Sequence, residues 1–275
     1  MSVAIIQGCS KGLGRALVQN LLATTKLNVI GTTASGAKHA RESILSEAST
    51  GSDAENRLTT LDMDVRDEDA IRRVSEEIQS KFGEKPLRML VNVSGMLHAE
   101  KNIKQISHAE ALRSFEINTI GHMLAFKHFV PLVARGPKEG EEDHAQGILP
   151  GGKSLLASIS ARVGSIEDNE LGGWYSYRAS KAALNQVIKT LSRELKSRNV
   201  PAVALAYHPG TVRTGLSKDF VGPDFKAPGK ESNKGRDYGV FDPSEAADKL
   251  LSVVKGMDAS ASGSFLDWTG SRVPW

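Results

Sequence analysis

The sequence has little cysteine, almost no excess of one charge and no long apolar run. Cys9 is the only cysteine in 275 residues, which excludes an intramolecular disulfide and fits a reducing compartment. No apolar run has the length of a membrane span, and a strand-like segment from Val3 leaves no room for a signal peptide. The net charge of +3 is too small to favour nucleic acid. We therefore expect a cytoplasmic protein with no membrane segment, no nucleic-acid partner and no metal site.

A glycine-rich turn joins the first predicted strand to the first predicted helix. The apolar segment 3–6 is followed by Gly8, Gly12 and Gly14, and residues 15–22 have apolar side chains at helical spacing. Glycines permit a tight turn, and a helix N-terminus offers free N–H groups to an anion. No Lys-Ser/Thr pair follows the glycines, so the turn is not a P-loop. It predicts a dinucleotide pyrophosphate site, although a glycine-rich turn without a ligand can have the same pattern.

The first 41 positions contain no acidic residue but five lysines or arginines, and Glu42 is the first acid of the chain. In a dinucleotide-binding fold, an acid about 20 residues past the glycines accepts hydrogen bonds from the 2′-hydroxyl of NAD. Its absence favours a 2′-phosphate, and hence NADP(H). The candidate contacts are Lys11, Thr32, Thr33 and Ser35. Any one of the basic residues, taken alone, is more often simply solvated.

Strand and helix patterns alternate along the whole chain. Further strands are predicted at 27–31, 57–63, 87–91, 154–158, 203–207 and 264–266, and further helices at 37–48, 67–81, 108–134, 174–196 and 243–255. This alternation predicts an α/β fold, a single Rossmann-type domain over 1–275 with a doubly wound parallel sheet of about seven strands and helices on both faces. Two irregular segments remain: a polar, glycine-rich stretch at 136–152, interpreted as a surface insertion, and a stretch at 216–241, interpreted as a substrate lid.

Tyr177 and Lys181 begin the predicted helix 174–196. Four residues apart, they lie on one face of a helix. A nearby ammonium favours the phenolate and lowers the pKa of a tyrosine, which is ordinarily about 10. The pair could therefore exchange protons with a substrate. Tyr175 has no lysine at this spacing. The wide apolar stripe of the same helix indicates a subunit interface, and we expect a homodimer or homotetramer.

With these features in place, the chain resembles the short-chain dehydrogenase/reductase family over nearly its full length. The motifs that carry the resemblance are Gly8-x-x-x-Gly12-x-Gly14, Asp64-Val65, Asn92-x-x-Gly95, Asn118, a serine before the helix, Tyr177-x-x-x-Lys181 and Pro209-Gly210. The runs from Gly164 to Ile166 and from Gly172 to Arg178 are similar to those of Sniffer- and C-factor-type carbonyl reductases.

The resemblance implies an NADP(H)-dependent oxidoreductase that reduces a ketone, aldehyde or quinone-like carbonyl to an alcohol. It implies that Tyr177 donates a proton to the carbonyl oxygen and that Lys181 binds the nicotinamide ribose and lowers the pKa of Tyr177. Ser160 would bind the substrate oxygen, and Asn118 would hold a water linking Lys181 to solvent. The cofactor-binding residues implied are Gly8, Ser10, Lys11, Gly12, Leu13, Gly14, Thr32, Thr33, Asp64, Val65, Asn92, Ser94, Gly95, Tyr177, Lys181, Pro209, Gly210, Val212 and Thr214.

The chain departs from the family pattern at the serine. The family commonly has its second serine three residues before a glycine, but Ala161 occupies that position here and Ser160 lies four before Gly164. Ser158 and Ser165 are therefore alternatives to Ser160. Two other functions also remain open: a catalytically idle nucleotide-sensing module on the same fold, and a methyltransferase, which would not need the tyrosine–lysine pair.

Overall fold

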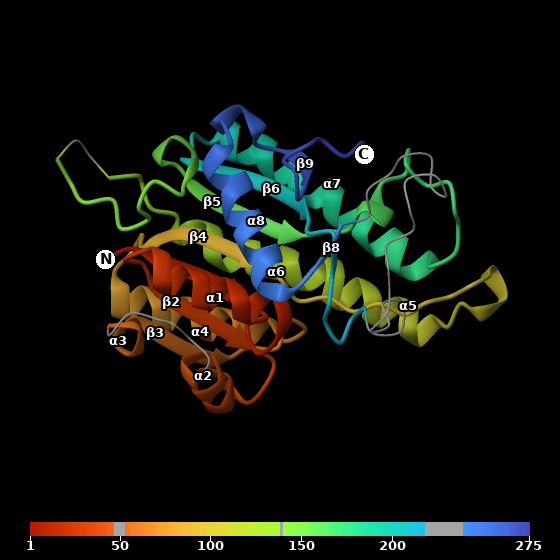
Figure 1. Ribbon diagram of the computed structural model, residues 1–275, viewed down its shortest axis with the longest axis horizontal. Helices are drawn as coiled ribbons and strands as arrows, with labels where there is room; N and C mark the ends of the chain where they lie inside the picture. The colour runs from red at the N-terminus through yellow and green to blue at the C-terminus, as the bar shows by residue number, and fades with distance from the viewer. Residues whose placement is uncertain (47–52, 138–139, 218–238) are drawn as a thin grey trace.

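The computed structural model describes residues 1–46, 53–137, 140–217 and 239–275. Seven parallel strands form one sheet in the order β3-β2-β1-β4-β5-β6-β9 (Figure 1). The strands are β1 (Val3–Gln7), β2 (Asn28–Thr33), β3 (Leu58–Asp62), β4 (Leu87–Asn92), β5 (Ser154–Ile159), β6 (Ala202–His208) and β9 (Ser264–Asp267). The strand order reverses between β1 and β4, and open α/β sheets bind ligands beyond the carboxyl ends of the strands at such a point.

Helices cover both faces of this sheet. The chain forms α1 (Gly12–Thr24), α2 (Ala37–Ser46), α3 (Ala54–Arg57), α4 (Glu68–Phe82), α5 (His108–Phe115), α6 (Gly121–Phe129), α7 (Tyr175–Ser197) and α8 (Pro243–Gly256). Ala4 and Ile6 pack with α1, α2 and α8 on one face, and Val3 and Ile5 pack with α4, α6 and α7 on the other. This alternation follows from the two-residue period of a strand, whose successive side chains point to opposite faces.

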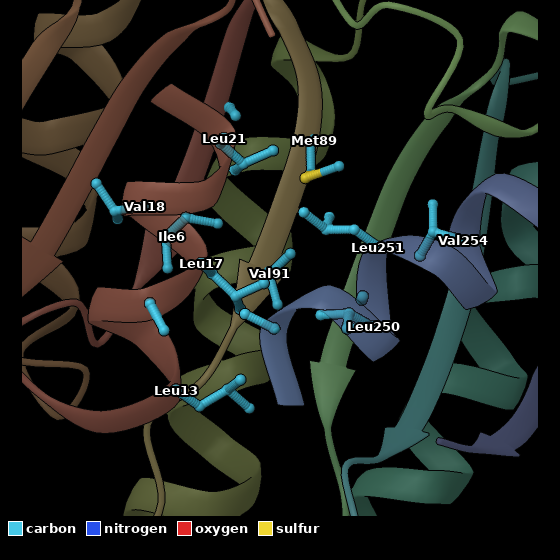
Figure 2. Close-up of a cluster of buried hydrophobic side chains, with 14 of the residues drawn as sticks. Ile6, Leu13, Leu17, Val18, Leu21, Met89, Val91, Leu250, Leu251 and Val254 are labelled. Carbon is cyan, nitrogen blue, oxygen red and sulfur yellow. The ribbon is translucent and has the colours of Figure 1, made fainter. Parts of the chain in front are cut away.

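The core beneath α1 and α8 fixes the position of the glycine turn. Figure 2 shows Leu17 of α1 toward Leu250 of α8, with Leu21 further along α1, and Ile6 and Val91 of the sheet belong to the same cluster. All five side chains are fully buried. Each such burial contributes about 1.5–3 kcal/mol. Because α1 is anchored along its length, the backbone N–H groups of its first turn have a fixed direction.

Short elements complete the fold. A separate two-stranded parallel sheet pairs β7 (Thr211–Val212) with β8 (Val240–Phe241). Single turns of 3₁₀ helix occur at η1 (Ile103–Gln105), η3 (Val130–Leu132), η4 (Pro150–Gly152), η5 (Arg162–Gly164) and η6 (Ala259–Ala261), and η2 (Glu116–Ile120) is a π-helical turn between α5 and α6. The predicted doubly wound sheet is confirmed, whereas β7–β8 and the π turn were not predicted. Most of the predicted lid at 216–241, namely residues 218–238, lies outside the described residues.

The prediction of a surface insertion at 136–152 is wrong for part of that segment. Ala145, Ile148 and Leu149 are buried and belong to the core beside α1. Asp143 makes this possible, because its carboxylate accepts hydrogen bonds from the backbone N–H groups of Ala145 at 3.0 Å and Gly147 at 2.8 Å. Because the Asp143 carboxylate satisfies these backbone N–H groups of the turn, three apolar side chains can reach the core from a segment that is polar on average.

Two absences apply to the described ranges alone. None of their helices is both long enough and apolar enough to cross a membrane. They also contain no group of three or more histidine, cysteine, aspartate or glutamate side chains placed to hold a metal ion.

Candidate active site

A cleft of about 1240 Å³ lies at the carboxyl edge of the sheet. Gly8, Thr33, Asp64, Ser94 and Ser160 line it and end or closely follow β1, β2, β3, β4 and β5 in turn. Most of the predicted site residues line this one space: Gly8, Ser10, Lys11, Gly12, Leu13, Thr33, Asp64, Val65, Ser94, Gly95, Ser160, Tyr177, Lys181, Pro209, Gly210, Val212 and Thr214.

Four predicted site residues, Gly14, Thr32, Asn92 and Asn118, do not line the cleft among the residues described. Thr32 is fully buried and its hydroxyl has no hydrogen-bond partner there. Successive residues of a strand point to opposite faces, so Thr33 reaches the cleft and Thr32 does not. Asn92 is also fully buried, and its side-chain N–H donates to Ser158 Oγ at 3.4 Å.

The glycine turn brings backbone close to backbone. A Cβ on Gly14 would lie 2.0 Å from the carbonyl oxygen of Gly8, so only glycine fits this contact. Gly8 has φ +90°, a conformation that glycine adopts readily. Helix α1 starts beyond Lys11, whose side chain makes no capping hydrogen bond. The first N–H groups of α1 therefore lack a capping side chain and lie beside Ser10 and Gly12 on the cleft wall, where they can bind an anion.

The charges on the cleft wall favour an anionic ligand. The two acids among the described lining residues, Asp64 and Asp168, are both ion-paired. Arg66 reaches Asp64 at 2.6 Å and holds the pKa of that carboxyl below its usual range, and Arg162 reaches Asp168 at 2.6 Å. The lining basic residues are Lys11, Arg15, Arg66, Arg113, Arg162, Arg178, Lys181 and Arg213. Lys11 and Arg15 lie at the end of the cleft formed by the glycine turn and β2.

Tyr177 and Lys181 are buried on the same wall, at 7% and 3% exposure. Lys181 Nζ donates to the carbonyl oxygen of Ile159 at 2.8 Å and lies 5.9 Å from the centre of the Tyr177 ring. Burial raises the pKa of Tyr177 and lowers the pKa of Lys181 to about 7. The expected lowering of the tyrosine pKa by the ammonium is therefore outweighed by loss of solvation. A neutral phenol at pH 7 is the form that can donate a proton.

Asn118 lies in the π turn and is fully buried. Its side chain accepts from Met96 N at 2.8 Å, donates to Met96 O at 2.9 Å and donates to Ser180 Oγ at 3.0 Å. A Cβ on Gly95 would lie 3.5 Å from Asn118 Oδ1 and 3.7 Å from Lys181 Nζ. Asn118 thus joins the loop after β4 to α7 close to the lysine ammonium.

The three candidate serines differ in their contacts. Ser158 is fully buried and lies 3.0 Å from the ring Nδ1 of His122. Ser165 Oγ donates to the main-chain oxygen of Trp275 at 3.3 Å. Of the three, Ser160 alone is among the described residues that line the cleft, but it is 2% exposed and donates to Asn185 Oδ1 at 2.6 Å. Asn185 lies on α7, and sequence analysis gave no sign of this pairing.

Several cleft residues were not predicted. Trp174 and Trp268 provide aromatic walls, and His208, the last residue of β6, lines the cleft as well. Arg178 donates to the carbonyl oxygens of residues 163, 172 and 173 and so fixes the loop before α7. A signal was present, because Arg178 lies in the first turn of α7, where a cation is unfavourable to the helix dipole and needs another reason to be there.

We expect the protein to lose stability as the pH falls below 6.5. Burial, helped by Lys181, lowers the pKa of His122 to about 3. Between pH 6.5 and 3 His122 binds a proton in the unfolded chain but not in the folded chain, so the free energy of unfolding decreases as the pH is lowered. At pH 5 this one residue should account for about 2 kcal/mol. Urea unfolding from pH 8 to 5 measures the slope, and His122→Gln is the control: an equally steep slope in that variant would contradict the assignment.

The chain is similar in sequence to a known protein family and to characterised proteins. A family model described as Enoyl-(Acyl carrier protein) reductase matches residues 8–252. C-signal of Myxococcus xanthus is 30% identical over 190 residues, which cover 69% of this chain and 93% of that protein. The chain belongs to the short-chain dehydrogenase/reductase family. The resemblance in the sequence is thereby confirmed, and the protein is an oxidoreductase of that family.

A further relative and two solved structures are similar to this chain over nearly its full length. The benzil reductase ((S)-benzoin forming) of Saccharomyces cerevisiae is 26% identical over 98% of this chain and 97% of its own. The NADPH-bound carbonyl reductase from chicken fatty liver superposes with a TM-score of 0.78 at 24% identity, over 100% of this chain and 98% of that one. The carbonyl reductase Sniffer of Drosophila melanogaster gives 0.78 at 23% identity, over 100% and 99%. These two structures show the same fold.

Proposed function

We propose that this short-chain dehydrogenase/reductase is an NADP(H)-dependent carbonyl reductase in which Tyr177 is the general acid. The observation that carries the proposal is the buried, neutral phenol of Tyr177 beside Lys181 on the wall of a cleft rich in basic residues. The similar proteins support a carbonyl reductase, since a benzil reductase and an NADPH-bound carbonyl reductase are among them.

The described residues suit NADPH at three places. The N–H groups at the start of α1 and the glycine turn would hold the pyrophosphate, and Lys11 would meet the 2′-phosphate. Lys181 would donate to the nicotinamide ribose hydroxyls, at the other end of the cleft. No unpaired carboxylate lies among the described lining residues to repel the phosphate. When bound, NADPH supplies the hydride that the carbonyl carbon receives.

The protein's own part in the reaction is proton transfer. Tyr177 Oη donates its proton to the carbonyl oxygen, and the ammonium of Lys181 stabilises the phenolate that remains. With a pKa of about 7, Lys181 populates both protonation states near neutrality and can pass a proton on. Asn118, joined to the backbone of Met96 and to Ser180 of α7, would hold the water that returns this proton from solvent.

Ser160 would bind the substrate oxygen only if its hydroxyl turns away from Asn185. We expect Ser160→Ala to lower kcat/KM about a hundredfold, the typical loss of one oxyanion donor. Ser158→Ala and Ser165→Ala should have far smaller effects on steady-state turnover. The matched control is Asn185→Ala, which removes the present partner but keeps the hydroxyl. Should Asn185→Ala reduce kcat/KM as much as Ser160→Ala, the serine acts by packing and not by binding substrate.

The preference for NADPH over NADH tests whether Lys11 and the absence of an unpaired carboxylate favour a 2′-phosphate. One lysine–phosphate hydrogen bond contributes about 1.5–3 kcal/mol, which is roughly a ten- to a hundred-and-fifty-fold preference for NADPH. Lys11→Glu or Thr33→Asp should erode or invert this preference in kcat/KM, measured with both cofactors on one carbonyl substrate. Lys85→Glu, an equal charge change on an exposed residue just before the opposite end of β4, is the control. Equal use of NADH and NADPH by the unmodified protein would overturn the NADP assignment.

A catalytically idle nucleotide-binding module is the alternative on the same fold. Such a module would bind NADPH but would not oxidise it in the presence of any carbonyl compound. A screen of NADPH oxidation across aldehydes, ketones, quinones and diketones separates the two functions.

A further inference from the structure

The residue before the catalytic helix has an unusual backbone conformation. Trp174 has φ 52° and ψ 43°, in the left-handed region, and it is the N-cap residue of α7. Gly172 and Gly173 precede it with φ of 64° and 66°. Glycine adopts this conformation freely, but a bulky residue does so rarely and only where its surroundings hold it. Such outliers gather at functional sites, and they persist only where the surrounding structure holds them.

Glu100 holds this segment from a distant part of the chain. Its main-chain oxygen accepts from Trp174 N at 2.6 Å. Its side-chain oxygens accept from the backbone N–H of Ser176 at 3.3 Å and from the hydroxyl of Ser176. Glu100 is 1% exposed. The N-terminus of α7 has no capping side chain of its own, so a buried carboxylate from the loop after β4 takes that role.

The indole is placed beside the catalytic tyrosine. Trp174 lines the cleft, and its ring meets the ring of Tyr177 edge-on, with 6.2 Å between centroids and 70° between planes. A carbonyl oxygen bonded to the Tyr177 hydroxyl would therefore place its substituent near the indole. Leu97 and Leu171 line the cleft as well, and they add apolar surface. Aromatic rings gain from neighbours at 4.5–7 Å, which an aliphatic group does not match.

We propose that Trp174 is a specificity-determining residue that selects carbonyl substrates carrying a planar aromatic group, and that Glu100 is the residue that positions it. The proposal deepens the carbonyl reductase function and rests on it. Losing the aromatic wall should lower the preference for an aryl over an alkyl substrate about tenfold, equal to about 1.4 kcal/mol.

The test compares 1-phenyl-1,2-propanedione with 2,3-hexanedione as substrates for NADPH oxidation. The measured quantity is the ratio of kcat/KM for the aryl to the alkyl diketone. Trp174→Leu, which keeps an apolar side chain, should lower this ratio about tenfold, and Trp174→Phe should retain most of it. Tyr175→Ala is the matched control, because Tyr175 is an adjacent, 41% exposed aromatic residue that is not among the described lining residues.

Glu100 is tested in the same assay. Glu100→Ala should lower the aryl-to-alkyl ratio as Trp174→Leu does, whereas Glu100→Gln keeps an acceptor and should retain more of the ratio. Melting temperatures separate this effect from loss of fold, since a purely structural role would reduce both diketone rates equally. An unchanged ratio in Trp174→Leu overturns the specificity role while carbonyl reduction stands. Absence of turnover with both diketones in the unmodified protein overturns the proposed function itself, and the inference with it.

Discussion

Replacing Tyr177 with phenylalanine should lower kcat about a thousandfold, a typical loss for a general acid. The ring that packs against Trp174 is kept, and only the hydroxyl that donates the proton is lost. NADPH affinity should therefore change less than about threefold, because the phenol acts mainly in the chemical step. Stopped-flow oxidation of NADPH under single-turnover conditions and a fluorescence titration of NADPH measure the two quantities.

Tyr175→Phe is the control for this prediction. It removes a hydroxyl two residues away on the same helix, from a side chain that is 41% exposed. We expect it to turn over like the unmodified protein. A Tyr177→Phe variant with near-normal kcat would contradict the mechanism, whatever the behaviour of the control.

Lys181→Ala should damage both turnover and cofactor binding. The ammonium is expected to stabilise the phenolate of Tyr177 and to bind the nicotinamide ribose, so two roles are lost together. One charge-assisted hydrogen bond contributes about 1.5–3 kcal/mol, which predicts roughly a ten- to a hundred-and-fifty-fold weaker NADPH affinity. We expect kcat to fall at least about a hundredfold as well. Calorimetric titration of NADPH and steady-state kinetics give the two values.

The contrast between the two variants matters more than either value. Tyr177→Phe should separate kcat from cofactor affinity, and Lys181→Ala should lower both. Lys196→Ala, on the exposed surface near the end of the same helix, is the matched control. Normal NADPH affinity in Lys181→Ala would remove the lysine from the cofactor site, even if its turnover were lost.

Much of this architecture could be predicted because it depends on local pattern. Alternating apolar strands and amphipathic helices predicted the parallel sheet, and the glycine turn before α1 predicted the anion-binding end of the cleft. Tyr177 and Lys181 could be placed together because a helix fixes the spacing of residues four apart. All of these features depend on backbone geometry within one or two elements.

The features that were missed depend on contacts between distant residues. The hydroxyl of Ser160 meets Asn185 on another element, and the carboxylate of Glu100 caps α7 from the loop after β4. Thr32 and Thr33 were both predicted at the cleft, but successive side chains of a strand point to opposite faces, so only Thr33 of the two lines it. A pattern along the sequence does not specify which distant side chain satisfies a buried polar group, since that depends on packing in three dimensions.

The central claim is hydride reduction of a carbonyl with a proton from Tyr177, and isotope transfer tests it most directly. The protein would be incubated with NADPH deuterated at the transferable position of nicotinamide C4 and with 1-phenyl-1,2-propanedione, and the product analysed by mass spectrometry. We predict a hydroxyketone carrying one deuterium on the new carbinol carbon, and loss of almost all of this product with Tyr177→Phe. Tight binding of NADPH without a deuterated alcohol from this or any other carbonyl would contradict the account and favour an idle nucleotide-binding module.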